Sequence, residues 1–484
     1  MTIPPATPHG LLEAYDKGAF YCEMMDGAMR DPRIAEILRR LTHVTPEDLK
    51  RRAEIAEAEL YNLGITFTVY SDRDAIDRIL PFDLIPRVLS PREWDIVERG
   101  VKQRVAALNA FLWDIYHDRA ILRDNVVPER LVLGNSNYRP EMIGLDVPHR
   151  TYVHVCGTDI VRDEKGRFLV LKDNARTPSG VSYVVENRHM MARMFSDLFD
   201  GIAVRPVGDY GMRLHEALTE IAPSGDAEPR VVLLSPGIYN SAYFEHIFLA
   251  REMGVPLVEG RDLIVEDGRV WMRTTAGLAP VHAIYRRLND EFLDPGVFNP
   301  DSVLGVRGLI DVWRRGKVAI ANAVGTGVAD DKAIYAYMPR IIRYYLSEEP
   351  ILANVETHIC GEQEGLDFTL KHLAELVVKP VGESGGYGMI VGPRATQTEL
   401  AEFREKLLAD PANYISQPTI ALSVSPTLIG SRLEPRHVDL RPFAVTGKST
   451  GVLPGGLTRV ALREGSLVVN SSQGGGSKDT WVLE

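Results

Sequence analysis

The 484-residue sequence contains only three cysteines, and none of them has the Cys-x-x-Cys spacing of a thiolate metal site. Cys22, Cys156 and Cys360 lie far apart along the chain, which argues against a disulfide framework and is typical of a reducing cytosol. No apolar run approaches the roughly 20 residues that a membrane helix requires. The first residues have neither the basic nor the apolar segment of a signal peptide. We therefore expect a cytoplasmic protein that does not cross a membrane.

Positive charge is also in short supply. The chain has 55 Lys and Arg against 66 Asp and Glu, a net charge of −11. This balance argues against nucleic acid or an anionic membrane as the main partner, although a local basic pocket for a small anion stays possible. The length is too great for one ordinary hydrophobic core, so we expect several packed units.

Helical patterns dominate the beginning of the chain. A Thr-x-x-Asp cap at Thr45 opens a helix that should stop at Gly64, and residues 65–70 should form a short strand. A second helix should begin at Ser90 or Pro91, because apolar residues then recur at steps of three and four. These apolar residues are expected to be core: Trp94, Val97, Val101, Val105, Leu108, Leu112 and Ile115.

Strand patterns follow from about residue 150. Residues 150–177 contain two apolar runs around a turn at 163–166, which predicts a hairpin. Residues from about 229 to 285 alternate strand, helix and strand, as in a Rossmann-like βαβ unit. Another strand at 317–325 should precede one helix at 331–346.

The segment ELVVKPVGESGGYGMIVG, at 375–392, places a lysine and several glycines between two apolar runs. Glycines let backbone N–H groups approach phosphate oxygens, and Lys379 supplies positive charge. The segment has neither the GxxxxGK[ST] pattern of a P-loop nor a GxGxxG pattern that opens a helix. Two interpretations stay open: a flap over bound phosphates, or a glycine-rich hairpin with a surface lysine.

The hairpin at 150–177 carries a second group of polar residues. Asp159 lies on its first strand, and Asp173 and Asn174 lie at the end of its second strand. Two carboxylates and an amide oxygen would suit Mg²⁺, while Arg176 could neutralise a transferring phosphoryl group. The alternative is a solvated hairpin with Asp and Asn in ordinary turn positions.

Together these segments resemble the circularly permuted ATP-grasp proteins, specifically the uncharacterised type 2 group similar to glutathionylspermidine synthetase. The likeness covers nearly the whole chain from PFDLIPRVLSPREW onward. In an ordinary ATP-grasp enzyme the lysine and glycine loop precede the metal hairpin, whereas here the hairpin comes first. The most specific segments are DNARTPSGVSYVVENR, YRRLNDEFLDP, DDKAIYAYMP, VVKPVGESGGYGM and HVDLRPF.

The resemblance implies an α/β (α+β) fold, a circularly permuted ATP-grasp fold with a Rossmann-like (pre-ATP-grasp) substrate domain and a helical N-terminal region. The expected division is 1–85 for the helical region, 86–228 for the first ATP-grasp part with the metal hairpin, 229–325 for the substrate domain, and 326–484 for the ATP-binding part with the glycine flap.

The resemblance also implies a role for individual residues. Lys332 and Lys379 would hold the nucleotide phosphates, Gln417 would contact the adenine, and three glycines would form the flap. The flap glycines are Gly385, Gly386 and Gly388. Arg287 and Arg441 would bind anions near the reacting centre. In the tail, Lys478 is either a substrate contact or part of a disordered end.

One position departs from the pattern that the resemblance implies. The metal hairpin of such ligases usually carries Glu-x-Asn, and the matching tripeptide here is Lys-Asp-Asn at 172–174. Because a lysine at 172 would repel Mg²⁺, three outcomes are open. Asp173 takes over through a bulge, Glu186 helps, or the metal site is weakened. Pleat alternation alone points Asp173 away from its two neighbours.

The implied activity is ATP-dependent ligation of a small-molecule acid to an amine or peptide through an acyl phosphate, with ATP and Mg²⁺ as cofactors. Two alternatives remain: a nucleotide-binding pseudo-ligase with little turnover, which Lys172 favours, and a phosphotransferase that uses the same ATP cradle. His154 and Cys156, beside the hairpin, are expected to be structural, since no third metal ligand or catalytic base is evident.

Overall fold

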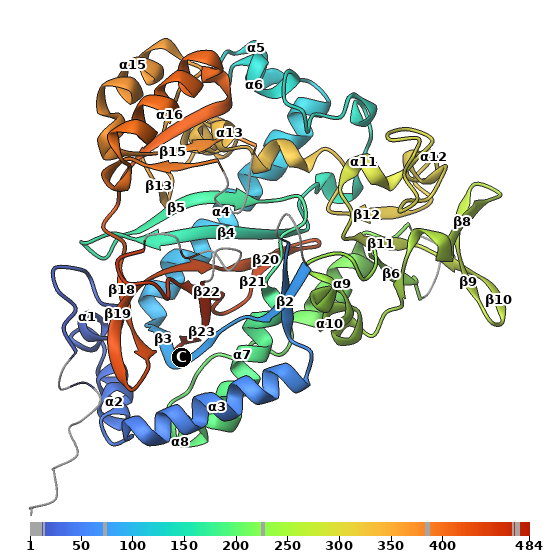
Figure 1. Ribbon diagram of the computed structural model, residues 1–484. Coiled ribbons are helices and arrows are strands. Elements are labelled where there is room, and N and C mark those ends of the chain that lie inside the picture. Colours follow the sequence, from blue (N-terminus) through green and yellow to red (C-terminus); the bar gives the residue numbers. More distant parts are fainter. Residues whose placement is uncertain are drawn as a thin grey trace, which may run out of the picture.

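Figure 1 shows the computed structural model of the chain. The structure describes residue 12 and residues 15–70, 75–223, 228–382, 388–466, 469 and 475–484. The fold is mixed α/β, and a large, mainly antiparallel sheet is flanked by a parallel sheet and a small antiparallel sheet.

Helices dominate the first part of the chain: α1 (Met25–Ala28), α2 (Pro32–Leu41) and α3 (Pro46–Asn62). The Thr45 side chain accepts a hydrogen bond from the Asp48 N–H (3.1 Å) and caps α3, so the predicted helix start is confirmed. The strand expected at 65–70 is β1 (Thr66–Tyr70), which pairs with β2 (Ala75–Ile79).

The long helix α4 (Pro91–Tyr116) begins with a capping box between Ser90 and Glu93, as the sequence predicts. All seven apolar residues expected on its core face are fully buried. This helix packs against α14 (Met338–Leu346) and the strands around it.

The large sheet has the order β13-β5-β4-β19-β22-β23-β3, and three further strands branch from it. The predicted hairpin is the antiparallel pair β4–β5, whose turn closes where the Gly166 N–H donates to the Asp163 carbonyl (2.9 Å). The strands are β3 (Phe82–Leu89), β4 (Val155–Arg162), β5 (Phe168–Asn174), β13 (Ala353–Asn354), β18 (Val424–Ile429), β19 (Arg432–Arg441), β20 (Phe443–Thr446), β21 (Thr450–Val452), β22 (Leu457–Val460) and β23 (Gly476–Val482).

The second sheet is parallel, with the order β12-β11-β6-β7. The predicted βαβ unit is present in it as β6, α10 and β7. The segment between β7 and β11 forms a separate three-stranded meander of β8 (Leu263–Glu266), β9 (Arg269–Thr274) and β10 (Gly277–Val281). The elements of the parallel unit are β6 (Val231–Leu234), α10 (Tyr243–Met253), β7 (Leu257–Val258), β11 (Ala283–Arg286) and β12 (Ala319–Ala321), with α9 (Tyr210–Glu220) beside them.

The small sheet has the order β14-β17-β15-β16 and a hydrophobic core of its own. In Figure 1 it lies with its helices above the β4–β5 end of the large sheet. Two linkers, 355–357 and 419–423, join it to the large sheet. Its elements are β14 (His358–Ile359), α15 (Gln363–His372), β15 (Leu376–Pro380), β16 (Ile390–Val391), α16 (Gln397–Ala409) and β17 (Tyr414–Pro418).

The prediction of a single helix at 331–346 is wrong in one respect. The segment forms two helices, α13 (Lys332–Ala336) and α14. Pro339 explains the break, since proline lacks an N–H donor and belongs in the first turn of a helix. The other helices are α5 (Ala120–Arg123), α6 (Glu129–Leu133), α7 (Val181–Met194), α8 (Ser196–Phe199), α11 (Asp290–Leu293) and α12 (Leu309–Arg314). The 3₁₀ segments are η1 (Pro140–Met142), η2 (Pro148–Arg150), η3 (Gly260–Asp262), η4 (Thr326–Asp330), η5 (Leu373–Glu375), η6 (Gly392–Arg394) and η7 (Pro411–Asn413).

No helix within the described part of the chain is both long and apolar enough to cross a membrane.

Candidate functional site

The register of the β4–β5 hairpin decides which polar side chains share a face. Asp159 lies opposite Lys172, and Thr158 lies opposite Asp173. Because successive side chains alternate across a sheet, Asp159 and Lys172 point to one face while Asp173 points to the other. A register shift does occur in the hairpin, but it follows Asp159 and leaves Asp173 beside Thr158.

Asp159 is held by two arginines from neighbouring strands. Arg441 donates to both carboxylate oxygens, from Nε at 2.6 Å and from a terminal nitrogen at 3.0 Å. Arg459 approaches the same carboxylate at 3.3 Å and also pairs with Asp439. Burial raises the pKa of Asp159, but the two guanidiniums outweigh this effect and hold it below its ordinary value. Asp159 is therefore ionised and already engaged by cations.

A glycine makes room for Arg441 on this face. A Cβ atom at Gly157 would lie 3.1 Å from Cδ of Arg441, so a side chain there would press on the arginine. Arg441 also donates to the carbonyl of Ser179 (3.0 Å), in the turn that precedes α7. The arginine thus joins the hairpin to this turn.

Asp330, at the end of η4, brings a second carboxylate to the hairpin. One of its oxygens accepts the backbone N–H groups of Ala175 (2.5 Å) and Arg176 (3.2 Å), and Arg176 Nε lies 3.8 Å from the other. Burial raises the pKa of Asp330, and Lys172 and Arg176 oppose that effect. The carboxylates of Asp159 and Asp330 both act to raise the pKa of Lys172.

Asp173 lies on the opposite face, within the core. Arg104 of α4 donates to both of its oxygens, with a shortest distance of 2.6 Å, and Thr158 Oγ donates at 3.1 Å. Each side chain of this ion pair is 1% exposed. The structure therefore does not bring Asp173 together with Asp159.

The other two predicted metal ligands are also separated from each other. The Asn174 side chain donates across the hairpin to the Gly157 carbonyl (2.8 Å) and stays half-buried at the strand end. Glu186 lies on α7, where its carboxylate is 3.8 Å from His189 and 3.6 Å from Arg251.

Lys379 is on β15 of the small sheet. Its ammonium donates to Gln417 Oε1 of β17 (2.7 Å), and the Gln417 amide donates to Thr357 Oγ (2.9 Å). Burial, reinforced by the positive charge of Lys172, lowers the pKa of Lys379 to about 8, while Asp159 acts in the opposite direction. The charges of Lys172 and Asp159 on the β4–β5 hairpin therefore both act on Lys379, although the hairpin ends about 200 residues earlier in the chain.

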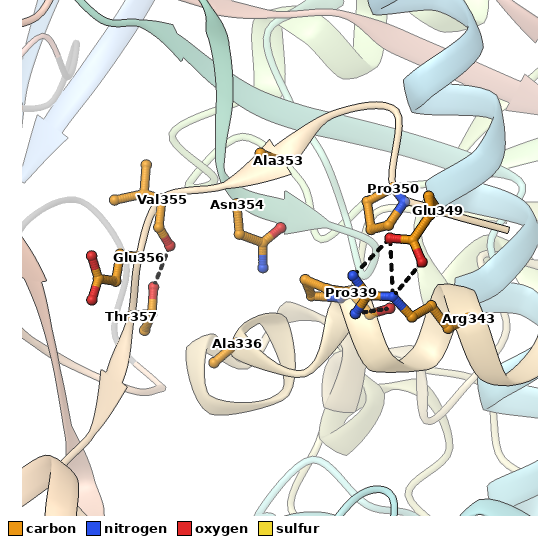
Figure 2. Close-up of a pocket in the computed structure, with 10 residues that line it drawn as sticks. All are labelled: Ala336, Pro339, Arg343, Glu349, Pro350, Ala353, Asn354, Val355, Glu356 and Thr357. Carbon is orange, nitrogen blue, oxygen red and sulfur yellow. Dashed lines mark hydrogen bonds and ion pairs between the residues drawn. The ribbon is translucent and has the colours of Figure 1, made fainter.

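A pocket of about 420 Å³ adjoins the linker that leads to Thr357 (Figure 2). One wall comes from α13 and α14, where Arg343 pairs with Glu349 at 2.8 Å. In another wall, Asn354 accepts from Arg104 (2.8 Å) and donates to the Tyr335 carbonyl (2.7 Å). Its lining residues are Ala336, Pro339, Arg343, Glu349, Pro350, Ala353, Asn354, Val355, Glu356 and Thr357.

Lys332 begins α13 and reaches toward the strand that carries Lys379. Its ammonium donates to the carbonyls of Pro380 (2.7 Å) and Val381 (3.2 Å). Of the three predicted flap glycines, Gly388 is described and has φ +69°, a conformation that favours glycine. Gly385 and Gly386 lie outside the described residues.

Arg287, at the end of β11, is buried. It donates to Glu245 (2.9 Å) and to the Pro178 carbonyl (2.7 Å). Glu245 in turn accepts from the N–H groups of Gly180 (2.6 Å) and Ser182 (3.2 Å). This pair therefore fixes the turn at 178–182 against the parallel sheet.

Three other residues named in the sequence analysis, Lys478, His154 and Cys156, are buried within the fold. The Lys478 ammonium is fully buried and donates to Asp83 and to the carbonyls of Ile85 and Pro426. His154 is buried against the Thr446 carbonyl, and burial lowers its pKa to about 4. Burial raises the pKa of the Cys156 thiol.

The sequence that forms these elements matches a known protein family. Residues 86–461 match the circularly permuted ATP-grasp type 2 family. The chain belongs to this family. An uncharacterized protein of Synechocystis sp. is 54% identical over 98% of the chain and 99% of its own length.

Other relatives of this ATP-grasp chain extend the comparison. A Frankia alni protein named "Putative glutamate--cysteine ligase 2-3" is 42% identical over 98% of the chain, which spans 54% of that relative. A glutathione synthetase-like effector (GSS30) from Globodera pallida has a TM-score of 0.59 at 12% identity, over 91% of this chain and 98% of the effector. That likeness shows the fold alone. The mixed α/β architecture is consistent with a circularly permuted ATP-grasp fold, and membership implies ATP binding.

The side chains of this ATP-grasp site do not fit a resident Mg²⁺. Among the described residues, no three His, Cys, Asp or Glu side chains form a cluster that could hold a metal ion, so any Mg²⁺ would depend on one or two carboxylates. Both Asp159 oxygens are engaged by Arg441, and Lys172 lies opposite on the same face. Mg²⁺ seeks carboxylate oxygens in octahedral geometry, so guanidinium partners compete with it directly.

Sequence reasoning missed two residues of the site, Arg459 and Asp330. Arg459 pairs across the sheet with Asp439, and the HVDLRPF segment that contains Asp439 was recognised only for Arg441. Asp330 begins the DDKAIY segment, whose sequence pattern points only to the lysine. Arg459 reaches Asp439 and Asp159 through strand pairing, whereas Asp330 reaches the end of β5 from η4, so both contacts join segments that are distant in the chain.

Proposed function

We propose that this ATP-grasp chain is an ATP-dependent carboxylate–amine ligase that works through an acyl-phosphate intermediate. The observation that carries the proposal is the set of contacts that joins the strand of Lys379 to the β4–β5 hairpin. Lys332 donates to the Pro380 carbonyl beside Lys379, and Asp330, two residues before Lys332, accepts the N–H groups of Ala175 and Arg176 at the end of the hairpin. Two segments distant in the chain bring cations to one place, as binding of a triphosphate requires. Arg441 and Arg176 add guanidinium groups there.

The proposed chemistry has two steps. An oxygen of the substrate carboxylate attacks the γ-phosphorus, the bond to the β-γ bridging oxygen breaks, and ADP leaves. The amine nitrogen then attacks the acyl carbon, phosphate leaves with the bonding electron pair, and the nitrogen loses a proton as the amide forms. The protein's contribution is positioning and charge neutralisation.

Individual residues have the following parts in this proposal. Lys379 and Lys332 hold phosphates, Gln417 orients Lys379 and faces the base, and Arg176 and Arg441 offset charge on the transferring group. The proposed flap of Gly385, Gly386 and Gly388 would exclude water from the acyl phosphate. Arg287 acts through the turn at 178–182, which it and Glu245 fix.

The domain division expected from the sequence belongs to the same proposal. Residues 229–325 would bind the acid, because ligands of parallel sheets bind beyond the carboxyl ends of the strands. The name of the Frankia relative is compatible with an amino-acid substrate for that protein, but the present chain spans about half of it. The acid and amine are therefore proposed only as small molecules or peptides.

The test is ADP release from ATP in the presence of pooled small acids and pooled amines. A ligase releases ADP when both pools are present, and the product contains a new amide bond that mass spectrometry detects. Release that needs one hydroxyl-bearing acceptor and no amine would indicate a phosphotransferase instead. Binding of ATP without turnover in any pool would indicate a pseudo-ligase, the alternative that Lys172 favours.

The affinity for ATP should fall as the pH rises above about 8. The ammonium form of Lys379 binds phosphate, and burial lowers its pKa to about 8. Below that pH the proton is present and affinity is constant. Above it, each pH unit should weaken binding by up to about tenfold. Equilibrium binding at pH 6.5–9.5 measures this effect, and Lys379→Arg, which keeps its charge, should remove the part of the dependence that Lys379 contributes. A flat profile for the native protein would contradict the prediction.

A further inference from the structure

Lys172 is the one side chain of the β4–β5 face whose charge has no fixed partner. It lies opposite Asp159 in the register. Burial lowers the pKa of its ammonium, and the carboxylates of Asp159 and Asp330 oppose that effect. Even so, no hydrogen bond, and no ion pair within 4.0 Å, joins its ammonium to another group in the described part of the chain. The side chain is half-buried. Its ammonium can therefore turn toward an incoming anion.

The positive charges around Lys172 disfavour the binding of a divalent cation beside it. Arg441 and Arg459 already neutralise Asp159, and Lys379 shares the same field. A divalent ion placed between Asp159 and Asp330 would meet these cations at close range. A triphosphate, by contrast, would be attracted by all of them.

We propose that the Lys172 ammonium takes the place of a protein-bound divalent cation, so that the site binds a nucleoside triphosphate without metal coordination by its carboxylates. Lys172 and Lys379 then hold the phosphates from opposite sides, one from the large sheet and one from the small sheet. This inference rests on the proposed function, since it assumes a nucleotide site between the two sheets.

Equilibrium binding of ATP, followed by calorimetry, tests the inference with excess EDTA and with excess MgCl₂. The native protein should bind ATP in EDTA with an affinity within about threefold of that in MgCl₂. Lys172→Met should weaken binding in EDTA by about 10- to 100-fold, because a charge-assisted contact is lost. Lys165→Met, in the exposed turn of the same hairpin, should leave the affinity unchanged.

Lys172→Glu provides the converse measurement. It should bind ATP only with a divalent ion present, and the protein alone should then bind Mn²⁺, detected by electron paramagnetic resonance, whereas the native protein should not. Thermal unfolding of each variant verifies that it is folded.

The possible outcomes distinguish failure of the proposed role of Lys172 from failure of the proposed ligase function. Native protein that binds ATP only with MgCl₂ overturns the role of Lys172 and leaves the ligase proposal standing. Undiminished ATP binding by Lys172→Met in EDTA also overturns that role. No binding of ATP under either condition overturns both proposals.

Discussion

Replacing Lys379 with methionine should weaken ATP binding by about 100-fold or more. The ammonium is a charged group that the small sheet contributes to the proposed site, and its hydrogen bond to Gln417 of β17 (2.7 Å) fixes its position. Loss of one charge-assisted contact costs about 1.5–3 kcal/mol, and loss of a pre-oriented cation at a site of developing charge costs about 3–4 kcal/mol. Turnover should fall at least as much. Calorimetry with ATP and a single-turnover ADP assay measure the two effects separately.

Lys371→Met is the matched control for this experiment. Lys371 is an exposed lysine in the last turn of α15, on the same small sheet unit. The same chemical change there should alter neither affinity nor turnover. If both lysine variants bind ATP like the native protein, the small sheet does not contribute the phosphate site, and the proposed function loses its main support.

Replacing Asp173 with alanine should destabilise the protein by about 3–5 kcal/mol. The change leaves the Arg104 guanidinium buried without its carboxylate, because both side chains of the pair are 1% exposed. The Thr158 hydroxyl would also lose its acceptor. Urea unfolding measures the loss, which should be the same with and without MgCl₂.

Two further variants make this prediction specific. Asp95→Ala removes an exposed ion pair with Arg99 on the same helix α4, and should cost less than about 1 kcal/mol. The double change Arg104→Met with Asp173→Leu should restore much of the lost stability, since no charge is then buried alone. A stable Asp173→Ala variant that loses only Mg²⁺-dependent turnover would instead support a metal-ligand role for Asp173.

Features decided by neighbouring residues were predictable from the sequence. Thr45 and Ser90 marked helix starts because capping depends on three or four consecutive residues. The β4–β5 hairpin and the parallel β6–α10–β7 unit followed from apolar periodicity and turn residues. Pleat alternation also predicted that Asp173 would point away from Lys172, and the structure confirms that orientation.

Features decided by distant partners were not predictable in the same way. No residue near Asp173 in the sequence indicates that it pairs with Arg104, which lies 69 residues earlier in the chain. Arg287 belongs to a recognised segment, but its burial against Glu245 depends on how β11 and α10 pack. Arg459 reaches Asp159 only because β22, β19 and β4 lie in that order in the sheet. Side-chain pairing across a sheet requires strand order, which local patterns do not contain.

The position of β23 links completion of the sheet to synthesis of Gly476–Val482. This strand lies inside the large sheet, between β22 and β3, and it pairs in parallel with β3 near the start of the chain. Strand β3 is therefore synthesised some 390 residues before the strand β23 with which it pairs. Until Gly476–Val482 leaves the ribosome, β3 and β22 both expose an unpaired edge. We expect the nascent chain to depend on chaperones for this interval, and a chain cut before Gly476 to aggregate.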